Sequence, residues 1–439
     1  MPDADVAIIG GGPAGATAAA LLAAHGRRVV VLEKETFPRF HIGESLLPFN
    51  MDLFRRLGIE SRLRGQFVHK HGALLMSSDG SVTRYISFAD GIVPGYPMAF
   101  QVLRSAFDEL LLQRAAELGA EVHQGTTVLE ATPSSRTGCE LTVQGPGDAA
   151  PRRIAARFLL DASGRDAFLA SRRGLRDMTP HLRKAAVFAH FEGIPRAEGI
   201  RGGDIILVVL KDGWFWMIPL PGGVTSVGLV AEGTSLRKTG LPPEQLLEEA
   251  LRRCPAARRL TASARRISQV WSASDYSYGC RDVAGDGYLL LGDAAAFIDP
   301  IFSSGVWLAM SSAEMAADAL HEALGSRPDA ADLSPRRFRP YERKVRSHVA
   351  TYTRIVSRFY EPHFNDIFLS PGGRWGIRQA VVSLLAGHVE HRLGVRARLN
   401  MFYGIIRVQQ RVRLSPEVPL LAAFEEPRSA AVPPPPPSP

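Results

Sequence analysis

The chain has 439 residues, of which 46% are hydrophobic and 22% charged, and its formal net charge is +8. This length exceeds a single hydrophobic core and predicts two or three packed units of a soluble globular protein. No apolar run approaches the ~20 residues that span a bilayer, and the three cysteines lack C-x-x-C spacing, so we expect no membrane segment, disulfide framework or metal site. A reducing cytoplasm is the expected location.

The N-terminal residues predict a strand–helix–strand unit. Val6–Ile9 is a short apolar run typical of a buried parallel strand, an Ala/Leu-rich helix extends to about Ala24, and residues 28–33 form the second strand. The turn before the helix reads G-x-G-x-x-G, and Glu33 ends the second strand. Such glycines let the backbone approach a pyrophosphate at a helix N-terminus, and an acidic residue about twenty positions on accepts hydrogen bonds from ribose hydroxyls. The unit therefore predicts dinucleotide binding through Gly10, Gly12 and Gly15.

The central part of the chain is predicted to alternate between helices and strands up to about residue 184, after which the pattern changes to short strands. A helix is predicted over 106–118, strands near 121–123 and 158–161, a buried strand at 288–293 and a long helix over 306–324. Residues 185–270 show short strands with Gly/Pro turns and predict a separate β-sheet layer.

One strand of that layer contains two tryptophans. Trp214-Phe215-Trp216-Met217-Ile218-Pro219 holds two of the five tryptophans of the chain. Side chains at i and i+2 of a strand lie on one face, so Trp214 and Trp216 are expected to form an aromatic wall. Alone, such a wall most often serves core packing.

The C-terminal region is basic and mostly helical. Residues 336–413 carry sixteen Lys and Arg against four acids. A solvated helical face or an acidic protein partner fits this charge, whereas no nucleic-acid-binding motif accompanies it. The chain ends in a proline-rich tail, which is expected to be disordered.

Two further segments resemble those of a known superfamily. Asp161-Ala162-Ser163-Gly164-Arg165 and Gly292-Asp293-Ala294-Ala295 each follow an apolar strand, and with the N-terminal fingerprint they resemble the cofactor-contacting segments of FAD-dependent monooxygenases. The resemblance implies that Asp293 binds the flavin ribityl chain and that Arg104 lies near the pyrophosphate. For Asp293 a plain helix N-cap is the alternative. No second G-x-G-x-x-G is present, so no built-in nicotinamide domain is expected. The full set of expected FAD-binding residues is Gly10, Gly12, Pro13, Ala14, Gly15, Glu33, Lys34, Arg39, Ile42, Gly43, Glu44, Ser45, Arg104, Asp161, Gly292, Asp293, Pro300, Gly305 and Val306.

Within that superfamily the chain resembles the flavin-dependent halogenases. W-x-W-x-I-P at Trp214–Pro219 resembles their signature, and three more segments resemble theirs in the same order: Phe40–Pro48, Asp275–Tyr278 and Asp299–Val306. The resemblance spans residues 4–360. It implies a two-component reaction in which a separate flavin reductase delivers FADH2, O2 gives a flavin hydroperoxide, and chloride or bromide near Ser303, Ser304 and Gly305 becomes hypohalous acid.

The resemblance also gives Lys70 a role. Halogenases need one lysine at the end of a tunnel from the flavin, and Lys70, downstream of Gly43-Glu44-Ser45, matches its position. A solvated surface lysine is the alternative. The ammonium could hydrogen-bond hypohalous acid, or the amine could form a haloamine, and burial would favour the amine. With Lys70, the pair Trp214 and Trp216 is expected to be catalytic by separating flavin from substrate.

The acceptor is expected to be a small electron-rich aromatic ring, because the halogen arrives as an electrophile. The Ile301-Phe302-Ser303-Ser304 loop lacks the carboxylate found in free-tryptophan halogenases. The match is to enzymes for phenols or pyrroles, often tethered to an acyl carrier protein, which the basic C-terminal region could steer. The alternatives are an FAD-dependent aromatic hydroxylase of the same fold, an isoprenoid reductase, and a non-catalytic flavin-binding protein.

The expected architecture is α/β, with a Rossmann-like FAD-binding domain of the aromatic-hydroxylase type, a β-sheet substrate domain and a helical C-terminal region. The predicted ranges are 1–75, 100–180 and 275–330 for the FAD-binding domain, 76–99 and 181–274 for the substrate domain, 331–425 for the helical region and 426–439 for the tail.

Overall fold

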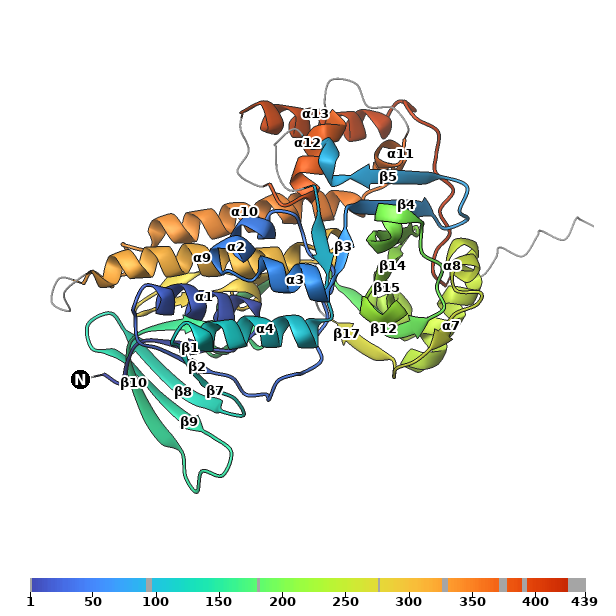
Figure 1. Cartoon of the computed structure of the whole chain (residues 1–439). Helices are drawn as coiled ribbons and strands as arrows, with labels where there is room; N and C mark the ends of the chain where they lie inside the picture. Colours follow the sequence, from blue (N-terminus) through green and yellow to red (C-terminus); the bar gives the residue numbers. More distant parts are fainter. Residues whose placement is uncertain are drawn as a thin grey trace, which may run out of the picture.

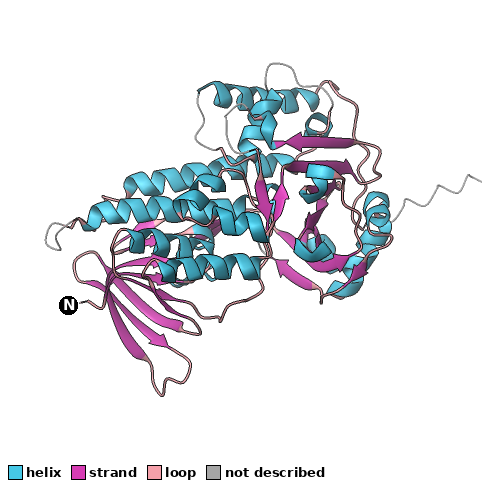
Figure 2. Ribbon diagram, in the orientation of Figure 1, coloured by secondary structure: helices cyan, strands magenta, loops and turns pink. Residues whose placement is uncertain are grey.

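The computed structural model describes residues 2–91, 97–179, 182–274, 277–325, 331–370, 377–388 and 393–424. Two large sheets with their covering helices form most of this part of the chain (Figure 1, Figure 2). The predicted α/β class is confirmed. The predicted tail, 426–439, and the halogenase-like residues Asp275 and Tyr276 lie outside the described residues.

The first sheet is built on the apolar N-terminal strands. Five strands run parallel in the order β20-β10-β1-β2-β7, with Asp161 of β10 opposite Ile9 of β1. Both faces are covered, which explains why β1 and β2 are almost uninterrupted apolar runs. Two antiparallel strands, β8 and β9, extend from β10 and project at the lower left of Figure 1. The strands of this sheet are β1 (Ala4–Ile9), β2 (Val29–Leu32), β7 (Glu121–His123), β8 (Thr127–Ser134), β9 (Gly138–Gln144), β10 (Arg152–Asp161), β19 (Ala284–Gly285) and β20 (Tyr288–Leu290).

Helix α1 lies between α4 and α9 on the first sheet, and α10 packs on α9 (Figure 1). The small side chains of α1 allow this close approach: a Cβ on Gly292 would lie 3.0 Å from that of Ala309 and 3.3 Å from that of Ala14. The turn that follows β20 therefore sits against the N-terminal end of α1. The helices of this unit are α1 (Pro13–Ala24), α2 (Asn50–Arg56), α3 (Glu60–Gln66), α4 (Arg104–Glu117), α5 (Phe168–Arg172), α9 (Ser304–Leu324) and α10 (Arg339–Phe359).

The second sheet has the order β16-β12-β15-β14-β13-β4-β5, and β17 pairs with β12. The predicted tryptophan-bearing strand is confirmed as β14. One face of the sheet packs against the C-terminal helices and the other against α7 and α8 (Figure 1). The elements are β4 (Gly72–Ser77), β5 (Thr83–Ser87), β12 (Lys184–Glu192), β13 (Ile205–Val209), β14 (Gly213–Pro219), β15 (Thr225–Glu232), β16 (Arg265–Arg266), β17 (Trp271–Ser274), α6 (Gly233–Lys238), α7 (Pro243–Arg253) and α8 (Pro255–Leu260).

Short elements connect the two sheets. Strand β3 pairs with β6 and leads directly into β4, so the end of β3 lies where the two large units meet (Figure 1). The helical C-terminal region packs above this junction. The domain boundaries given above stay a prediction. The remaining elements are β3 (Val68–Lys70), β6 (Ala99–Gln101), β11 (Arg176–Met178), β18 (Tyr278–Cys280), β21 (Ala296–Phe297), α11 (Phe364–Phe368), α12 (Ile377–Leu385) and α13 (Leu393–Gln409).

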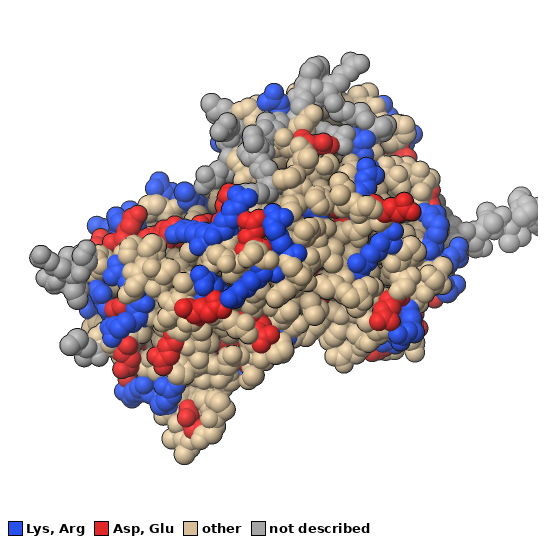
Figure 3. Space-filling view, in the orientation of Figure 1, with Lys and Arg blue, Asp and Glu red and all other residues tan. Residues whose placement is uncertain are grey.

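Charges on the face of Figure 3 are mixed rather than gathered by sign. On α2 and α3, for example, Arg56 pairs with Asp318 and Glu314, and Arg64 pairs with Glu60. No nucleic-acid-binding stripe follows from this face. No helix in the described ranges combines the length and apolarity that crossing a membrane requires.

Candidate functional site

The glycine-rich turn forms a cradle at the N-terminus of α1. Gly10 has φ +97°, and a Cβ there would lie 2.4 Å from the Ala162 carbonyl oxygen. A Cβ on Gly15 would lie 1.8 Å from the Gly10 oxygen, whereas one on Gly12 would meet only Arg39, 3.4 Å away. Gly10 and Gly15 are thus required by the turn itself, and Gly12 keeps an open approach between the loop and a guanidinium. Pro13 and Ala14 are the first residues of the helix.

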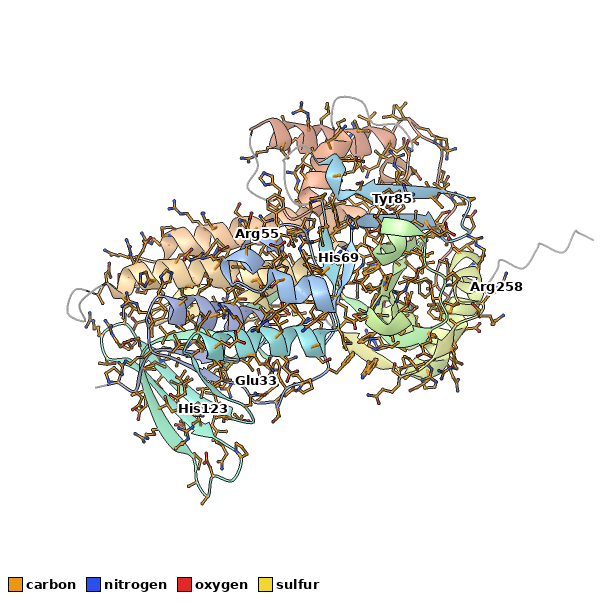
Figure 4. The ribbon with its side chains drawn as sticks, viewed as in Figure 1. Glu33, Arg55, His69, Tyr85, His123 and Arg258 are labelled. Atoms are coloured by element: carbon orange, nitrogen blue, oxygen red, sulfur yellow. The ribbon has the colours of Figure 1, made fainter. Side chains whose placement is uncertain are left out.

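Glu33 ties the second strand to this turn. Its carboxylate accepts hydrogen bonds from the main-chain nitrogens of Gly11, at 2.6 Å, and Glu35, at 2.8 Å. The side chain lies at the end of β2, below α4 in Figure 4. Lys34 points away to an exposed ion pair with Asp166.

A buried arginine at the start of α4 holds the Phe40–Pro48 loop. Arg104 forms a two-bond ion pair with Asp108, at 2.7 and 2.8 Å, and donates to the Ile42 carbonyl oxygen at 2.5 Å. A Cβ on Gly43 would lie 2.9 Å from Arg104 Nη1 and 3.8 Å from Val306 Cγ2. The structure therefore brings together residues from three expected segments of the cofactor site.

The carboxyl of Asp293 lies near this arginine. Burial raises the pKa of Asp293 to about 6, and the positive charges of Arg104 and Arg165 act against that rise. Asp161, in contrast, is engaged by its own chain, because its carboxylate accepts from Ser163 and from the Leu169 main chain. These bonds shape the end of β10, and contact of Asp161 with FAD stays a prediction.

These features fit FAD. The cradle is open at Gly12 toward Arg39, whose Nη1 lies 3.3 Å from the Asp108 carboxylate, and Glu44 Oε2 is buried without a hydrogen-bond partner among the described residues. A pyrophosphate suits the open cradle beside the Arg39 guanidinium, and a polar edge of the flavin ring suits the Glu44 carboxylate oxygen. Gly10 to Gly15, Glu33, Arg39, Gly43, Arg104 and Asp293 are the residues that would hold the cofactor.

Lys70 is buried at the end of β3, with a side chain only 2% exposed. Its Nζ donates to Ser45 Oγ at 2.8 Å and to the Leu46 carbonyl oxygen at 3.2 Å, and it lies 5.1 Å from the centre of the Phe88 ring. Burial lowers the pKa of Lys70 from 10.5 to about 7, while the charge of Asp204 acts in the opposite direction. The surface alternative for Lys70 is excluded by this burial.

The two histidines that flank Lys70 are less buried than the lysine. His69 is exposed and lies on the strand between the two sheets (Figure 4), and His71 is half-buried. Asp204 was not singled out from the sequence, yet its carboxylate accepts from the main chain of His71 and Gly72 and from the Tyr85 hydroxyl. It fixes the end of β3 and so the place of the lysine.

The two tryptophans share one face of β14, as predicted. Their ring centres lie 5.7 Å apart, and both side chains belong to the cluster that includes Ile298, Ile301 and Phe302. Phe215 packs on the opposite face. The wall therefore borders the Asp299–Val306 loop, while its edge at Trp216 continues through Phe188 toward Phe40 and Trp271. We keep the name tryptophan wall for Trp214 and Trp216.

The expected halide segment, Asp299–Val306, forms a turn at the start of α9, which we call the halide turn. Pro300–Phe302 is a 3-10 turn, Ser303 has φ +56°, and its side chain does not cap the helix that starts at Ser304. The first N–H groups of α9 are therefore available to an anion, near Gly305 and Val306.

Glu44 and His190 form a pair that the sequence did not reveal. Glu44 Oε1 lies 2.9 Å from His190 Nε2, and the His190 ring packs edge-on to Trp271. Since Ser45 follows directly and accepts from Lys70, the loop contacts both the histidine and the lysine. His190 sits on β12, far from any recognised motif, and only the pairing of distant elements identifies it.

Comparisons with known proteins show the family and the fold that the chain resembles. A family model described as "FAD binding domain" matches residues 3–348. The chain is 31% identical over 411 residues to a 1H-pyrrole-2-carbonyl-[peptidyl-carrier protein] chlorinase of Pseudomonas fluorescens, covering 88% of this chain and 90% of the relative. It is 37% identical over 340 residues to the flavin-dependent halogenase armH3 of Armillaria mellea, covering 72% and 67%. Among solved structures, that of the flavin-dependent brominase Bmp2 matches with a TM-score of 0.81 and 27% identity, covering 93% of this chain and 99% of that one.

Proposed function

The chain belongs to the flavin-dependent halogenases, enzymes that use FAD to halogenate aromatic compounds, and from this premise we propose that it chlorinates or brominates a pyrrole or phenol tethered to a carrier protein. FADH2 comes from a separate flavin reductase, and the halide and O2 are the co-substrates. The observation that carries the proposal is the buried Lys70, which is hydrogen-bonded to Ser45 of the Phe40–Pro48 loop, the flavin-side loop.

When bound, FAD would supply the oxidising chemistry, with O2 as co-substrate, that converts a halide ion to hypohalous acid. The protein holds the cofactor through the glycine cradle and Arg104. The halide binds at Ser303, Ser304 and Gly305, where the main-chain N–H groups of the α9 N-terminus neutralise its charge without a side-chain cation.

Lys70 presents the halogen to the ring. Its pKa of about 7 leaves both the ammonium and the amine populated near neutral pH. The ammonium can donate a hydrogen bond that polarises hypohalous acid, and the amine can accept the halogen itself. Ser45 Oγ and the Leu46 oxygen accept from Nζ and so fix its direction.

The tryptophan wall separates the halide turn from the substrate side. Both rings are large and nearly fully buried, with exposures of 2% and 4%, and each indole N–H is hydrogen-bonded. Such rings exclude a substrate from the oxidant, which distinguishes a halogenase from a hydroxylase of the same fold.

A basic groove on the C-terminal region favours a substrate carried by an acyl carrier protein over a free one. The ends of α10 and α13 form a groove in which exposed Val408 and Val412 alternate with basic side chains. Arg407 and Arg411 form no ion pair within the described ranges, so their charges can meet an acidic carrier protein and its phosphopantetheine phosphate. The similarity to a carrier-protein chlorinase points the same way.

The test is a reaction with FAD, a flavin reductase, NADH, O2 and chloride or bromide. Pyrrole and phenol carboxylates are offered free and as carrier-bound thioesters, and products are followed by mass spectrometry. A halogen mass shift on the carrier-bound ring is expected; an oxygen shift would mean a hydroxylase. An Arg407→Ala/Arg411→Ala variant should raise KM for the carrier-bound substrate only. Arg152→Ala/Arg153→Ala, on the distant β10, controls for the loss of two positive charges, although these arginines pair with Asp148 and Glu140.

A further inference from the structure

One hydroxyl joins three segments that are far apart in the sequence. Tyr360, directly after α10, donates to Asp299 Oδ2 at 2.8 Å and accepts from Trp214 Nε1 at 2.9 Å. Asp299 begins the halide turn and Trp214 is half of the tryptophan wall. The tyrosine lies outside the range of the FAD-binding family model, which ends at residue 348.

The bonds of Tyr360 are formed in a buried, charged setting. Asp299 is fully buried, and burial raises its pKa to about 6. Hydrogen bonds from the Tyr360 hydroxyl, the Ile301 main chain and Trp214, together with the Lys184 charge, act against that rise. Lys184 is 3% exposed, and its Nζ lies 3.9 Å from the centre of the Tyr360 ring. Lys184 in turn lies 3.4 Å from Glu232, and the charge of Asp212 lies near both. A hydrogen bond in such a place is strong, and its loss leaves a buried group unpaired.

The second oxygen of Asp299 reaches the halide turn. Asp299 Oδ1 accepts from the Ile301 main chain at 3.1 Å, and the Asp299 nitrogen donates to Ser277 Oγ at 3.2 Å. The carboxylate therefore fixes the turn that leads into α9 with one oxygen and holds Tyr360 with the other.

We propose that Tyr360 is a positioning residue that couples the tryptophan wall to the halide turn, so that the C-terminal region sets halide affinity and keeps the oxidant on its path. The inference rests on the proposed function, because it assumes that a halide binds before α9. Without the hydroxyl, Asp299 loses a donor and Trp214 loses its partner at 2.9 Å, so the two segments are joined by the weaker hydrogen bond of Trp214 to Asp299 itself.

The first test compares Tyr360→Phe with Tyr352→Phe. Tyr352 lies within α10, the helix that ends just before Tyr360, and its hydroxyl likewise donates to one buried acceptor, the Leu384 oxygen at 3.1 Å, without touching the halide turn. Tyr360→Phe should raise the chloride KM roughly tenfold, as expected for one buried hydrogen bond to a charged group, and lower the halogenated product formed per NADH. Tyr352→Phe should change neither, whatever its effect on the melting temperature.

The second test needs neither turnover nor flavin. The chain has five tryptophans, so 5-fluorotryptophan labelling gives five ¹⁹F resonances, and Trp214→Phe identifies one of them. Bromide should shift the Trp214 resonance in the wild type, and Tyr360→Phe should remove that response. Asp299→Asn should weaken it as well, which covers the case in which the tyrosine variant does not fold.

The outcomes separate the two proposals. If no ring is halogenated but bromide still shifts Trp214 through Tyr360, the proposed function fails and the coupling stands. If halogenation proceeds and Tyr360→Phe keeps the wild-type chloride KM, product ratio and bromide response, the coupling is refuted.

Discussion

Lys70 should titrate near neutral pH. Its side chain is enclosed by protein, and burial lowers its pKa from 10.5 to about 7. The unfolded chain keeps a pKa near 10.5, so between pH 7 and 10.5 the unfolded state binds the additional proton. The free energy of unfolding therefore rises as pH increases from 7 to 10.5. This gain in stability is lost again as pH falls back toward the folded pKa of about 7.

The size of this effect follows from the two pKa values. At 1.36 kcal/mol per pKa unit, the distance from 10.5 to about 7 corresponds to about 5 kcal/mol over the whole window. Between pH 6 and pH 9 the change is about 2.6 kcal/mol. Replacing Lys70 by Met removes the titration, so the stability of Lys70→Met relative to the wild type should be greatest at pH 6 and should decrease by that amount at pH 9.

Two measurements check this prediction. The chain has only six lysines, so ¹³Cε labelling of lysine resolves them by NMR, and Lys70→Met identifies one signal. That signal should titrate near pH 7, while exposed lysines titrate above pH 10. Urea unfolding of both proteins gives the stability difference at each pH. A Lys70 signal that titrates above pH 9.5, with a stability difference that does not change with pH, would refute the burial argument and the amine form at neutral pH.

Three further substitutions test the remaining parts of the site. Gly10→Ala should weaken FAD binding roughly tenfold or more, measured by flavin fluorescence, because its Cβ would lie 2.4 Å from a carbonyl oxygen; Gly65→Ala, with no atom within 4 Å in α3, should bind FAD normally. Gly228→Ala should cost about 1–3 kcal/mol in urea unfolding, because its Cβ would lie 2.3 Å from an indole carbon of the tryptophan wall; unchanged stability would contradict the packing described. Ser45→Ala should lower the Lys70 pKa further, since the ammonium loses an acceptor at 2.8 Å; an NMR titration at or above the wild-type midpoint would contradict this.

Local patterns sufficed for much of the fold. The apolar runs and glycine turn at the N-terminus predicted β1, α1 and β2, and period-2 placement predicted that Trp214 and Trp216 share a face. These features depend on a few consecutive residues, so they can be read without knowing the rest of the chain.

Residues that act across long sequence distances could not be predicted in this way. Asp204 fixes β3 through main-chain nitrogens more than 130 positions away, Glu44 meets His190 across 146 positions, and Tyr360 meets Trp214 across the same separation. A buried carboxylate or tyrosine that lies outside a motif has the same one-letter code as an exposed one. Only strand order and helix packing give these residues their partners.

The lysine and the halide turn are held by different parts of the fold. Ser45 joins Lys70 to the flavin-side loop, whose Ile42 oxygen is held by Arg104, so the lysine is positioned relative to the cofactor unit. Tyr360 joins the tryptophan wall to the halide turn and belongs to the C-terminal region, whose outer groove is basic. A carrier protein docked on that groove would contact Arg358 and Glu361, on either side of Tyr360 in the sequence. Substrate delivery and halide positioning thus meet at the end of α10, which makes this the place where carrier binding can influence formation of the halogenating agent.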